Sequence, residues 1–407
     1  MRRPRLLVLV VAVVVLGGAV SVLLPGTADA PNPDDSRARV AVPAPAEKDV
    51  PAPPSENVSG VVTDINVNDT GILTVAGKTQ RNGSAENVAV AFWIDREPAE
   101  SVSTETSAPP VPEPGRFSKA VQLREGPQEV CAIALNDAGP DAVLGCEKVM
   151  YRAQLVEGKM IIADYGSGAT PRLGIAGEGT PLEAAQRVAA RAKEWEEATG
   201  IPTIPAFDYI QTVAQASPGS DGDYSAHTSR EDLDTYLAAI RSVDGLLILD
   251  FQPGGGHFMK QVVQYEDYLR QPDVGLALDT EWRMPWGVAP ATIIGYATAS
   301  EINEVGEYLA NIVAEDNLPQ KAFVIHQFRA KMVRDRAAIV DRPELATIFH
   351  IDGHGTKQLK RTVYRQLLPG EEFYAGFKLF FDEDTGLMTP LEVRDDLARI
   401  PAMVSYQ

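Results

Sequence analysis

The sequence predicts an α/β protein with a C-terminal TIM-type (β/α)8 barrel, preceded by a small all-β sandwich. Between residues 155 and 407, short apolar runs recur, each stops at a polar residue, and most alternate with helix-like segments. A buried parallel strand reads as a continuous apolar run. Seven or eight such runs within about 250 residues match this barrel in number and length. Residues 58–152 instead carry short alternating runs separated by turn residues, which is typical of antiparallel strands.

The stretch 245–284 shows the repeating unit most clearly. Runs 245–249 and 274–278 stop at Asp250 and Asp279, with a helix-like segment between them. A strand, helix and strand of this length form a βαβ crossover. We therefore expect both aspartates at the carboxyl ends of neighbouring parallel strands, where α/β proteins place their chemistry.

Helix signals separate several of the predicted strands. Thr180, Pro181 and Glu183 form an N-terminal capping pattern for a helix over 181–198, and Gly200 closes it. Ser229 caps a second helix over 229–242, and a longer helix follows over 300–315. A doubly wound sheet is the alternative fold, but no Gly-rich phosphate turn follows the first strand. The other predicted strands span 160–164, 172–177, 202–207, 321–325, 346–349, 373–381 and 402–406.

Composition limits the classes of partner. The 407 residues carry a formal net charge of −19, which argues against nucleic acid or an anionic membrane surface. The balance fits a soluble extracellular protein with a neutral or cationic substrate. No pattern in the sequence indicates a cofactor or an oligomeric state.

The N-terminus has the layout of a secretory signal. Three arginines precede the apolar run 6–24, and a small-x-small site ends at Ala30. Residues 1–30 are therefore a signal peptide or, because the run is long enough to span a bilayer and Pro31 disfavours cleavage, a retained membrane tether. Residues 31–57 are rich in Pro and Ala and predict a spacer. We expect a protein that is secreted or anchored to the outer face of the cytoplasmic membrane.

The two cysteines of the chain, Cys131 and Cys146, lie in adjacent predicted strands of the β domain. One even pair in an exported protein predicts a disulfide. Trp93 lies in an alternating strand, and we expect it in the core. The segment EVCAIALNDAGPDAVLGCEKV resembles the last hairpin of small immunoglobulin-like domains in exported actinobacterial proteins. The resemblance implies an immunoglobulin-like domain over 58–152, which serves as a spacer or binds carbohydrate or wall material.

The barrel domain, residues 155–407, collects polar residues after its predicted strands. Any single strand-end aspartate is equally well a helix cap. The complete set instead predicts a substrate site at the barrel mouth. Its members outside the catalytic candidates are Glu178, Asp208, Tyr209, Gln252, Trp282, Trp286, His326, Gln327, His350, Asp352, Lys378 and Asp382.

The motif Asp279-Thr280-Glu281-Trp282 is the sharpest candidate for chemistry. Residues two apart on a strand face the same side, so both carboxylates would face the mouth. Their repulsion raises one pKa and provides an acid and a base near neutral pH, as glycoside hydrolysis requires. Trp282 and Trp286 offer flat faces for sugar rings.

LALDTEW resembles the Asp-x-Glu at the end of the fourth strand of barrel glycoside hydrolases, such as chitinase-like and muramidase families. The upstream aspartates of the fuller chitinase signature are absent. The resemblance implies Glu281 as the general acid and Asp279 as its partner. More broadly, the run from LLILDFQPG to GFKLFFDEDTGLMTP resembles a group of exported actinobacterial proteins without an established activity.

Two further chemistries remain open. The run His350-Ile351-Asp352-Gly353-His354 offers metal-ligand types, with His326 and Asp279 on neighbouring strands. No strand carries an HxH pair, so we predict no metal and expect His326 and His350 to bind substrate or tune a carboxylate. Lys378 is a Schiff-base lysine or, as we expect, the partner of a carboxylate.

The sequence thus predicts an exported glycoside-hydrolase-like protein that acts on a polysaccharide or cell-wall glycan. Glu281 is the acid, Asp279 its charge partner, and Asp250, Asp352 or Asp382 the base or nucleophile. The alternatives are a non-catalytic barrel that binds a glycan or protein at the envelope, and a metal-dependent hydrolase.

Overall fold

The computed structural model describes residues 58–67, 71–81, 84–85, 88–99, 101–102, 116–124, 126–136 and 139–407. The predicted signal or tether and the spacer lie outside these residues. Among the helices described, none is both long enough and apolar enough to cross a bilayer. The chain divides into two compact units between Tyr151 and Arg152.

The first unit is made of two antiparallel sheets that share one hydrophobic core, with residues such as Leu73 and Phe92. This confirms the prediction of an all-β unit. One sheet contains β1 (Val58–Val67), β2 (Ile72–Arg81), β3 (Ser84–Ala85), β6 (Ser101–Val102) and β7 (Arg116–Gln122). The other contains β4 (Ala89–Ile94), β5 (Glu97–Ala99), β8 (Gly126–Asn136) and β9 (Gly139–Tyr151).

The predicted disulfide is confirmed. Cys131 and Cys146 lie directly opposite each other on β8 and β9 and are bonded. The prediction that Trp93 belongs to the core is wrong. Val90, Phe92 and Ile94 are the buried residues of β4, and Trp93 is only half-buried, because successive side chains point to opposite faces.

The second unit contains a closed barrel of eight parallel strands, as predicted. It closes because β10 pairs with both β11 and the last strand, β20. The strands are β10 (Met160–Gly166), β11 (Thr203–Ala214), β13 (Leu246–Phe251), β14 (Val274–Leu278), β16 (Lys321–His326), β18 (Leu345–Ile351), β19 (Tyr374–Leu379) and β20 (Met403–Tyr406). β12 (Ser225–His227) adds an antiparallel hairpin to the end of β11.

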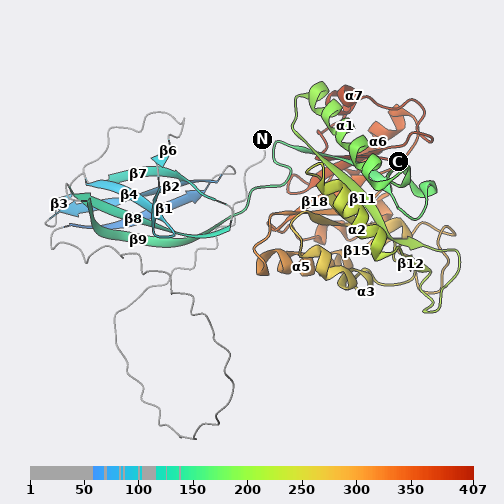
Figure 1. The fold of residues 1–407 in the computed structure, drawn as a ribbon, viewed down its shortest axis with the longest axis horizontal. Coiled ribbons are helices and arrows are strands. Elements are labelled where there is room, and N and C mark those ends of the chain that lie inside the picture. Colours follow the sequence, from blue (N-terminus) through green and yellow to red (C-terminus); the bar gives the residue numbers. More distant parts are fainter. Residues whose placement is uncertain are drawn as a thin grey trace, which may run out of the picture. The chain divides into compact units, whose positions relative to one another are not determined.

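Helices connect most of the strands and pack outside the barrel (Figure 1). They are α1 (Pro181–Thr199), α2 (Arg230–Arg241), α3 (Phe258–Val262), α4 (Glu266–Leu269), α5 (Ala299–Glu315), α6 (Lys357–Leu367) and α7 (Pro390–Asp396). Both predicted caps are present: Thr180 and Glu183 form the capping box of α1, and the side chain of Ser229 accepts from Asp232 N. The β16–β18 connection is the exception, with two 3-10 turns and the short strand β17 (Val333–Arg334).

The strand predicted over 172–177 is absent. Pro171–Leu173 and Ile175–Gly177 form two 3-10 turns, and Gly174 between them has φ = 139°. A proline at the start and a glycine at a positive φ favour a turn over an extended strand, although the run is apolar.

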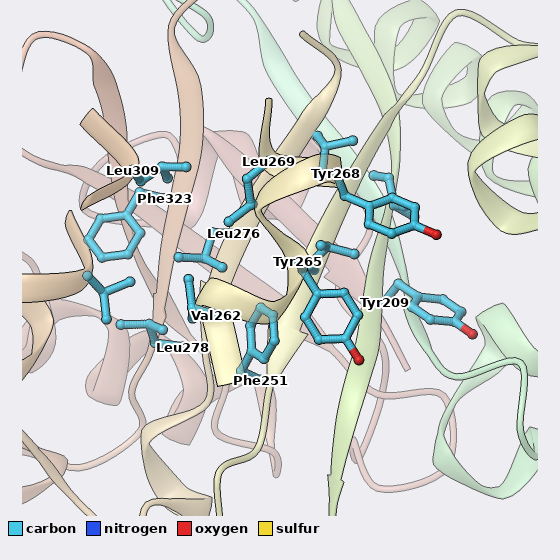
Figure 2. Packing of buried hydrophobic residues seen from close by; sticks show 14 of the residues in the cluster. Tyr209, Phe251, Val262, Tyr265, Tyr268, Leu269, Leu276, Leu278, Leu309 and Phe323 are labelled. Atoms are coloured by element: carbon cyan, nitrogen blue, oxygen red, sulfur yellow. The ribbon is translucent and has the colours of Figure 1, made fainter. Parts of the chain in front are cut away.

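Apolar side chains form one layer outside the barrel wall and a second layer inside it. The outer layer lies between strands and helices and includes Phe251, Leu276 and Phe323 (Figure 2). On the opposite arc, Trp195 of α1 donates its indole N–H to Tyr406 Oη at 2.9 Å. The inner layer is smaller and includes Ala163, Ile248 and Ile348. Its small size leaves the upper part of the barrel interior to polar side chains.

A buried ion pair ties two mouth loops together. Lys360 Nζ lies 2.8 Å from Asp384 Oδ2, and both side chains are almost fully buried. Lys360 also donates to the carbonyls of Gly353 and Lys378, while Asp384 accepts from the N–H groups of Gly355 and Phe380. The loops that follow β18 and β19 therefore depend on one another.

Lys360→Met should lower the free energy of unfolding by about 3–5 kcal/mol, because it leaves the Asp384 carboxylate buried without its cation. Urea titration followed by tryptophan fluorescence measures this. The control is Lys357→Met, which breaks the half-exposed pair of Lys357 with Glu392 and should cost under about 1 kcal/mol. Equal losses in the two variants would show that the buried pair does not hold the loops.

Candidate active site at the barrel mouth

Each strand of the barrel ends its inward-facing row with a polar or charged residue. Alternation places every second residue inside, so a buried apolar residue low in the barrel is followed two positions later by a polar one, as in Ile248 and Asp250. The resulting inner ring consists of Tyr165, Asp208, Asp250, Asp279, His326, His350, Lys378 and Ser405, all at most 4% exposed.

Tyr165 and Gln252 join two of the carboxylates. The Tyr165 hydroxyl lies 3.2 Å from Asp250 Oδ2 and 3.3 Å from Asp279 Oδ2. Gln252 Nε2 donates to Tyr165 Oη and to Asp279 Oδ2, at 3.1 and 3.3 Å. The Lys378 ammonium lies over the Tyr165 ring, 3.2 Å from its centroid. This network brings two acids from neighbouring strands to one polar centre.

The pKa values of the acids are raised. Burial, with the charge of Asp279, raises the pKa of Asp250 well above its usual range. Burial raises the pKa of Asp279 to about 6, although the charge of His326 acts in the opposite direction. Burial and the neighbouring Asp279 charge raise the pKa of Glu281 to about 8. At neutral pH, Glu281 is therefore protonated while Asp279 is mostly ionised.

Glu281 does not lie on the strand. β14 ends at Leu278, and Thr280–Trp282 form a 3-10 turn held by the hydrogen bond from Thr280 Oγ1 to the carbonyl of His326. The strand alternation that we used for Asp279 and Glu281 therefore does not apply. The two acids still interact electrostatically, because the turn keeps Glu281 near the ring. Trp282 lies half-buried in the same turn.

The two buried histidines each have an outer partner. His326 Nδ1 lies 2.9 Å from Asp352 Oδ2, and its Nε2 lies 3.5 Å from Asp208 Oδ2. Burial opposes a charge on this ring, but the Asp208 and Asp352 carboxylates raise the pKa of His326 well above its usual value. His350 Nε2 lies 2.7 Å from Ser405 Oγ, and burial beside the charge of His326 lowers the pKa of His350 well below its usual value.

Asp208, His326 and His350 are the group of the described residues that could hold a metal ion. One ligand atom from each lies within 4.8 Å of the other two, and all three side chains are buried. The sequence-based prediction considered His326 and His350 for a metal but not Asp208, which lies on β11.

An open groove lies among the loops that follow β13 and β14 and the start of α5. Its volume is about 380 Å³, and its walls include Arg283, Trp286, Tyr296 and Glu301. Trp286 is 66% exposed. Arg283 Nε donates to Glu301 Oε1 at 2.8 Å, so the polar wall is held in place by an ion pair.

Four predicted site residues lie elsewhere. Tyr209 follows Asp208 and therefore points outward, into the hydrophobic cluster of Figure 2. Its ring packs on that of Tyr236 in α2, with the two ring centroids 4.8 Å apart. Gln327 follows His326 and bonds the carbonyls of Arg329 and Ala330. Glu178 is exposed because the strand predicted before it is absent, and Asp382 is exposed in the β19–α7 loop.

Sequence reasoning missed Tyr165 and Ser405. The strand predicted over 160–164 ended at Asp164, which points outward and pairs with Arg191 of α1. Extending this strand by one residue and counting by two from Ala163 would have identified Tyr165. Ser405 lies in the short last strand and faces His350, two strands away.

No family model matches the chain, and no curated protein matches it. Similar solved structures include a cell-surface chitinase of a Paenibacillus species (10% identity, TM-score 0.30, 83% of this chain and 32% of that one). A second is the β-glucuronidase of Parabacteroides merdae, with 14% identity and a TM-score of 0.29 over 80% of this chain and 40% of that one. A third is β-glucuronidase 3 of Bacteroides uniformis, with 10% identity and a TM-score of 0.33 over 86% of this chain and 47% of that one. The chain spans less than half the length of each. At these TM-scores, the likeness does not decide its activity.

The raised pKa values predict that stability falls as pH rises. Asp279 and Glu281 bind protons more tightly in the folded chain than at their ordinary pKa values of 3.8 and 4.5. The folded state therefore holds more protons than the unfolded state between about pH 4 and pH 8, and stability is lost across that window. Thermal unfolding at several pH values should show Glu281→Gln with a shallower decline than the wild type. Glu178→Gln, the same change at an exposed site, should keep the wild-type slope.

Gly376 makes room for the His350 ring. A Cβ at position 376 would lie 2.2 Å from His350 Nδ1, so Gly376→Ala should displace the ring and cost about 1–3 kcal/mol of stability. Gly353→Ala is the control, because its Cβ would meet Phe328 at 3.4 Å, an ordinary contact. Differential scanning fluorimetry compares the two, and an unchanged melting temperature for Gly376→Ala would contradict the packing.

Proposed function

We propose that the barrel hydrolyses a glycan by carboxylate acid–base chemistry, with Glu281 as general acid. The observation that carries this proposal is the separation of two neighbouring pKa values, about 8 for Glu281 and about 6 for Asp279. Two acids whose pKa values are separated supply a proton donor and an ionised carboxylate at the same pH. Glycosidic bond cleavage requires this combination.

The remaining candidates are assigned by their contacts. Asp279 is the ionised base or nucleophile, because its pKa of about 6 lies below the value of about 8 for Glu281. Burial raises the pKa of Asp250 well above its usual range, and the Tyr165 hydroxyl lies between this acid and the Asp279 carboxylate. Asp352 is engaged by His326, and Asp382 is exposed, so neither serves as the base.

The groove supports a glycan as the ligand. Trp286 presents an exposed indole face, and Arg283, Tyr296 and Glu301 provide polar groups around it. Sugar rings combine apolar C–H faces with hydroxyls, and such a surface binds both. Arg283 and Trp286 of the groove follow Glu281 in the same loop, which links the groove to the acid along the chain.

We further propose that the chain is exported and that the β unit is an immunoglobulin-like spacer. The arginine-flanked apolar run 6–24 and the Cys131–Cys146 disulfide support export, because disulfides form in oxidising compartments. The test is fractionation of the native host. Recovery of the chain in the cytoplasm with reduced cysteines would contradict export.

Glu281→Gln should abolish glycan hydrolysis, with a loss of about 10²–10⁴-fold, because glutamine cannot donate the proton. The measurement is reducing-end release from a panel of polysaccharides and cell-wall glycans. For an active substrate, kcat/KM should be maximal between about pH 6 and pH 8, rising as Asp279 ionises and falling as Glu281 loses its proton.

The matched control is Glu178→Gln, which changes an exposed carboxylate away from the ring and should retain activity. Hydrolysis that survives Glu281→Gln would exclude Glu281 as the acid. Glycan binding by the wild type without any release of reducing ends would instead favour a non-catalytic binding barrel.

A further inference from the structure

The inner ring contains two fully buried histidines that face one another across neighbouring strands. Of the five histidines in the sequence, His326 and His350 are the two with no exposure. They are paired in register on β16 and β18, and their rings lie edge to face with centroids 5.1 Å apart. Asp208, on β11, approaches His326 from the other side at 3.5 Å.

Each ring uses one nitrogen for an outer contact and leaves the other without a hydrogen bond. His326 binds Asp352 through Nδ1, and its buried Nε2 has no hydrogen-bond partner. His350 binds Ser405 through Nε2, and its buried Nδ1 has none. Histidines that bind metals characteristically hold a second group with their other nitrogen, which fixes the ring and its tautomer. Asp352 and Ser405 occupy this position.

The charge balance around the histidines favours a cation. Both Asp208 oxygens are buried without a hydrogen-bond donor, as are Oδ1 of Asp250 and Oδ1 of Asp279. Burying a carboxylate oxygen without a hydrogen-bond donor is costly, and the basic group beside Asp208 is the His326 ring at 3.5 Å. The lysine of the inner ring, Lys378, has its ammonium group over the aromatic ring of Tyr165. Three buried carboxylates therefore face the centre of the barrel with unused lone pairs.

We propose that Asp208, His326 and His350 form a binding site for a divalent transition metal, with zinc as the probe ion. Two imidazoles and one carboxylate suit zinc and its neighbours in the first transition row, whereas magnesium and calcium prefer oxygen ligands alone. Three protein ligands leave one position of a tetrahedral zinc open for water or substrate. The site is separate from Glu281, and it does not depend on the proposed glycan hydrolysis.

The spacing requires only a small contraction. The three ligand atoms lie within 4.8 Å of one another. Zinc–nitrogen bonds of about 2.0–2.1 Å place tetrahedral ligand atoms about 3.4 Å apart, so the ligand atoms draw together by at most about 1.4 Å. Gly376 leaves the His350 ring free of a neighbouring Cβ on β19. A proton competes with the metal for this site. Bound to His326, it would make the ring an imidazolium between Asp208 and Asp352.

Zinc binding to the resting protein tests the site. The full chain, without a polyhistidine tag, is stripped with a chelator and titrated with zinc by calorimetry, and bound metal is counted by mass spectrometry. We expect one zinc per chain and a higher melting temperature on binding. Asp208→Asn and His350→Gln should each weaken binding by ~100-fold or more, and Asp352→Asn, which changes only the outer contact, by about 10–100-fold.

The control variants address the exposed histidines. His257 Nε2 lies 3.7 Å from Glu301 and 3.8 Å from Glu304, which makes it the strongest alternative zinc ligand at the surface. His257→Gln and His354→Gln should keep full binding. The cobalt-loaded wild type should show the visible absorption of a tetrahedral ion, and His350→Gln should lose it.

Stripped wild-type protein that takes up no zinc would overturn the proposal without any variant, even if the ligand variants fold poorly. Loss of binding in His257→Gln would overturn it equally, because the metal would then be at the surface. Neither result bears on the acid–base pair, whose test is glycan release by Glu281→Gln.

Discussion

Closure of the barrel is the constraint on which the rest of the structure depends. Because β10 pairs with both β11 and β20, every strand has a fixed inner and outer face. Successive residues then go to opposite environments: Asp208 to the centre and Tyr209 to the helix layer, His326 to the centre and Gln327 to the loop beside it. One added residue in any strand would exchange a buried charge for a buried apolar side chain. The inner ring exists because eight short strands keep the same alternation.

The ring places charge where water cannot solvate it. Carboxylates in such an environment either keep their protons, accept hydrogen bonds or find a cation. The structure shows all three outcomes within one site. Burial raises the pKa of Asp250 well above its usual range, Asp279 accepts from Tyr165 and Gln252, and Asp352 engages His326. The differences among chemically similar groups follow from their neighbours, and these differences separate an acid from a base.

Much of this could be predicted from the sequence, since apolar runs that end in polar residues report buried parallel strands. The closed barrel, the last strand beside the first, the capping box of α1 and the disulfide were all predicted correctly. The misses have local causes. The run 172–177 is apolar, but Pro171 and Gly174 make it a turn, and Glu178 is therefore not at a strand end. Strand ends were assigned without counting by two, so Tyr209 and Gln327 were included and Tyr165 was omitted. Contacts between distant strands, such as His350 with Ser405, leave no trace in sequence spacing.

The acid–base pair and the proposed metal site impose different demands on the same ring. Glu281 lies in a turn at its edge, half-buried, where a substrate can reach it, whereas Asp208, His326 and His350 are fully enclosed. A dication among these three would offset the buried negative charge of the neighbouring carboxylates. Metal binding would then lower the pKa of Asp279 and strengthen it as the ionised partner of Glu281. The same ring can therefore hold an enclosed set of ligands and, at its edge, an acid that a substrate can reach, because burial differs between the two positions.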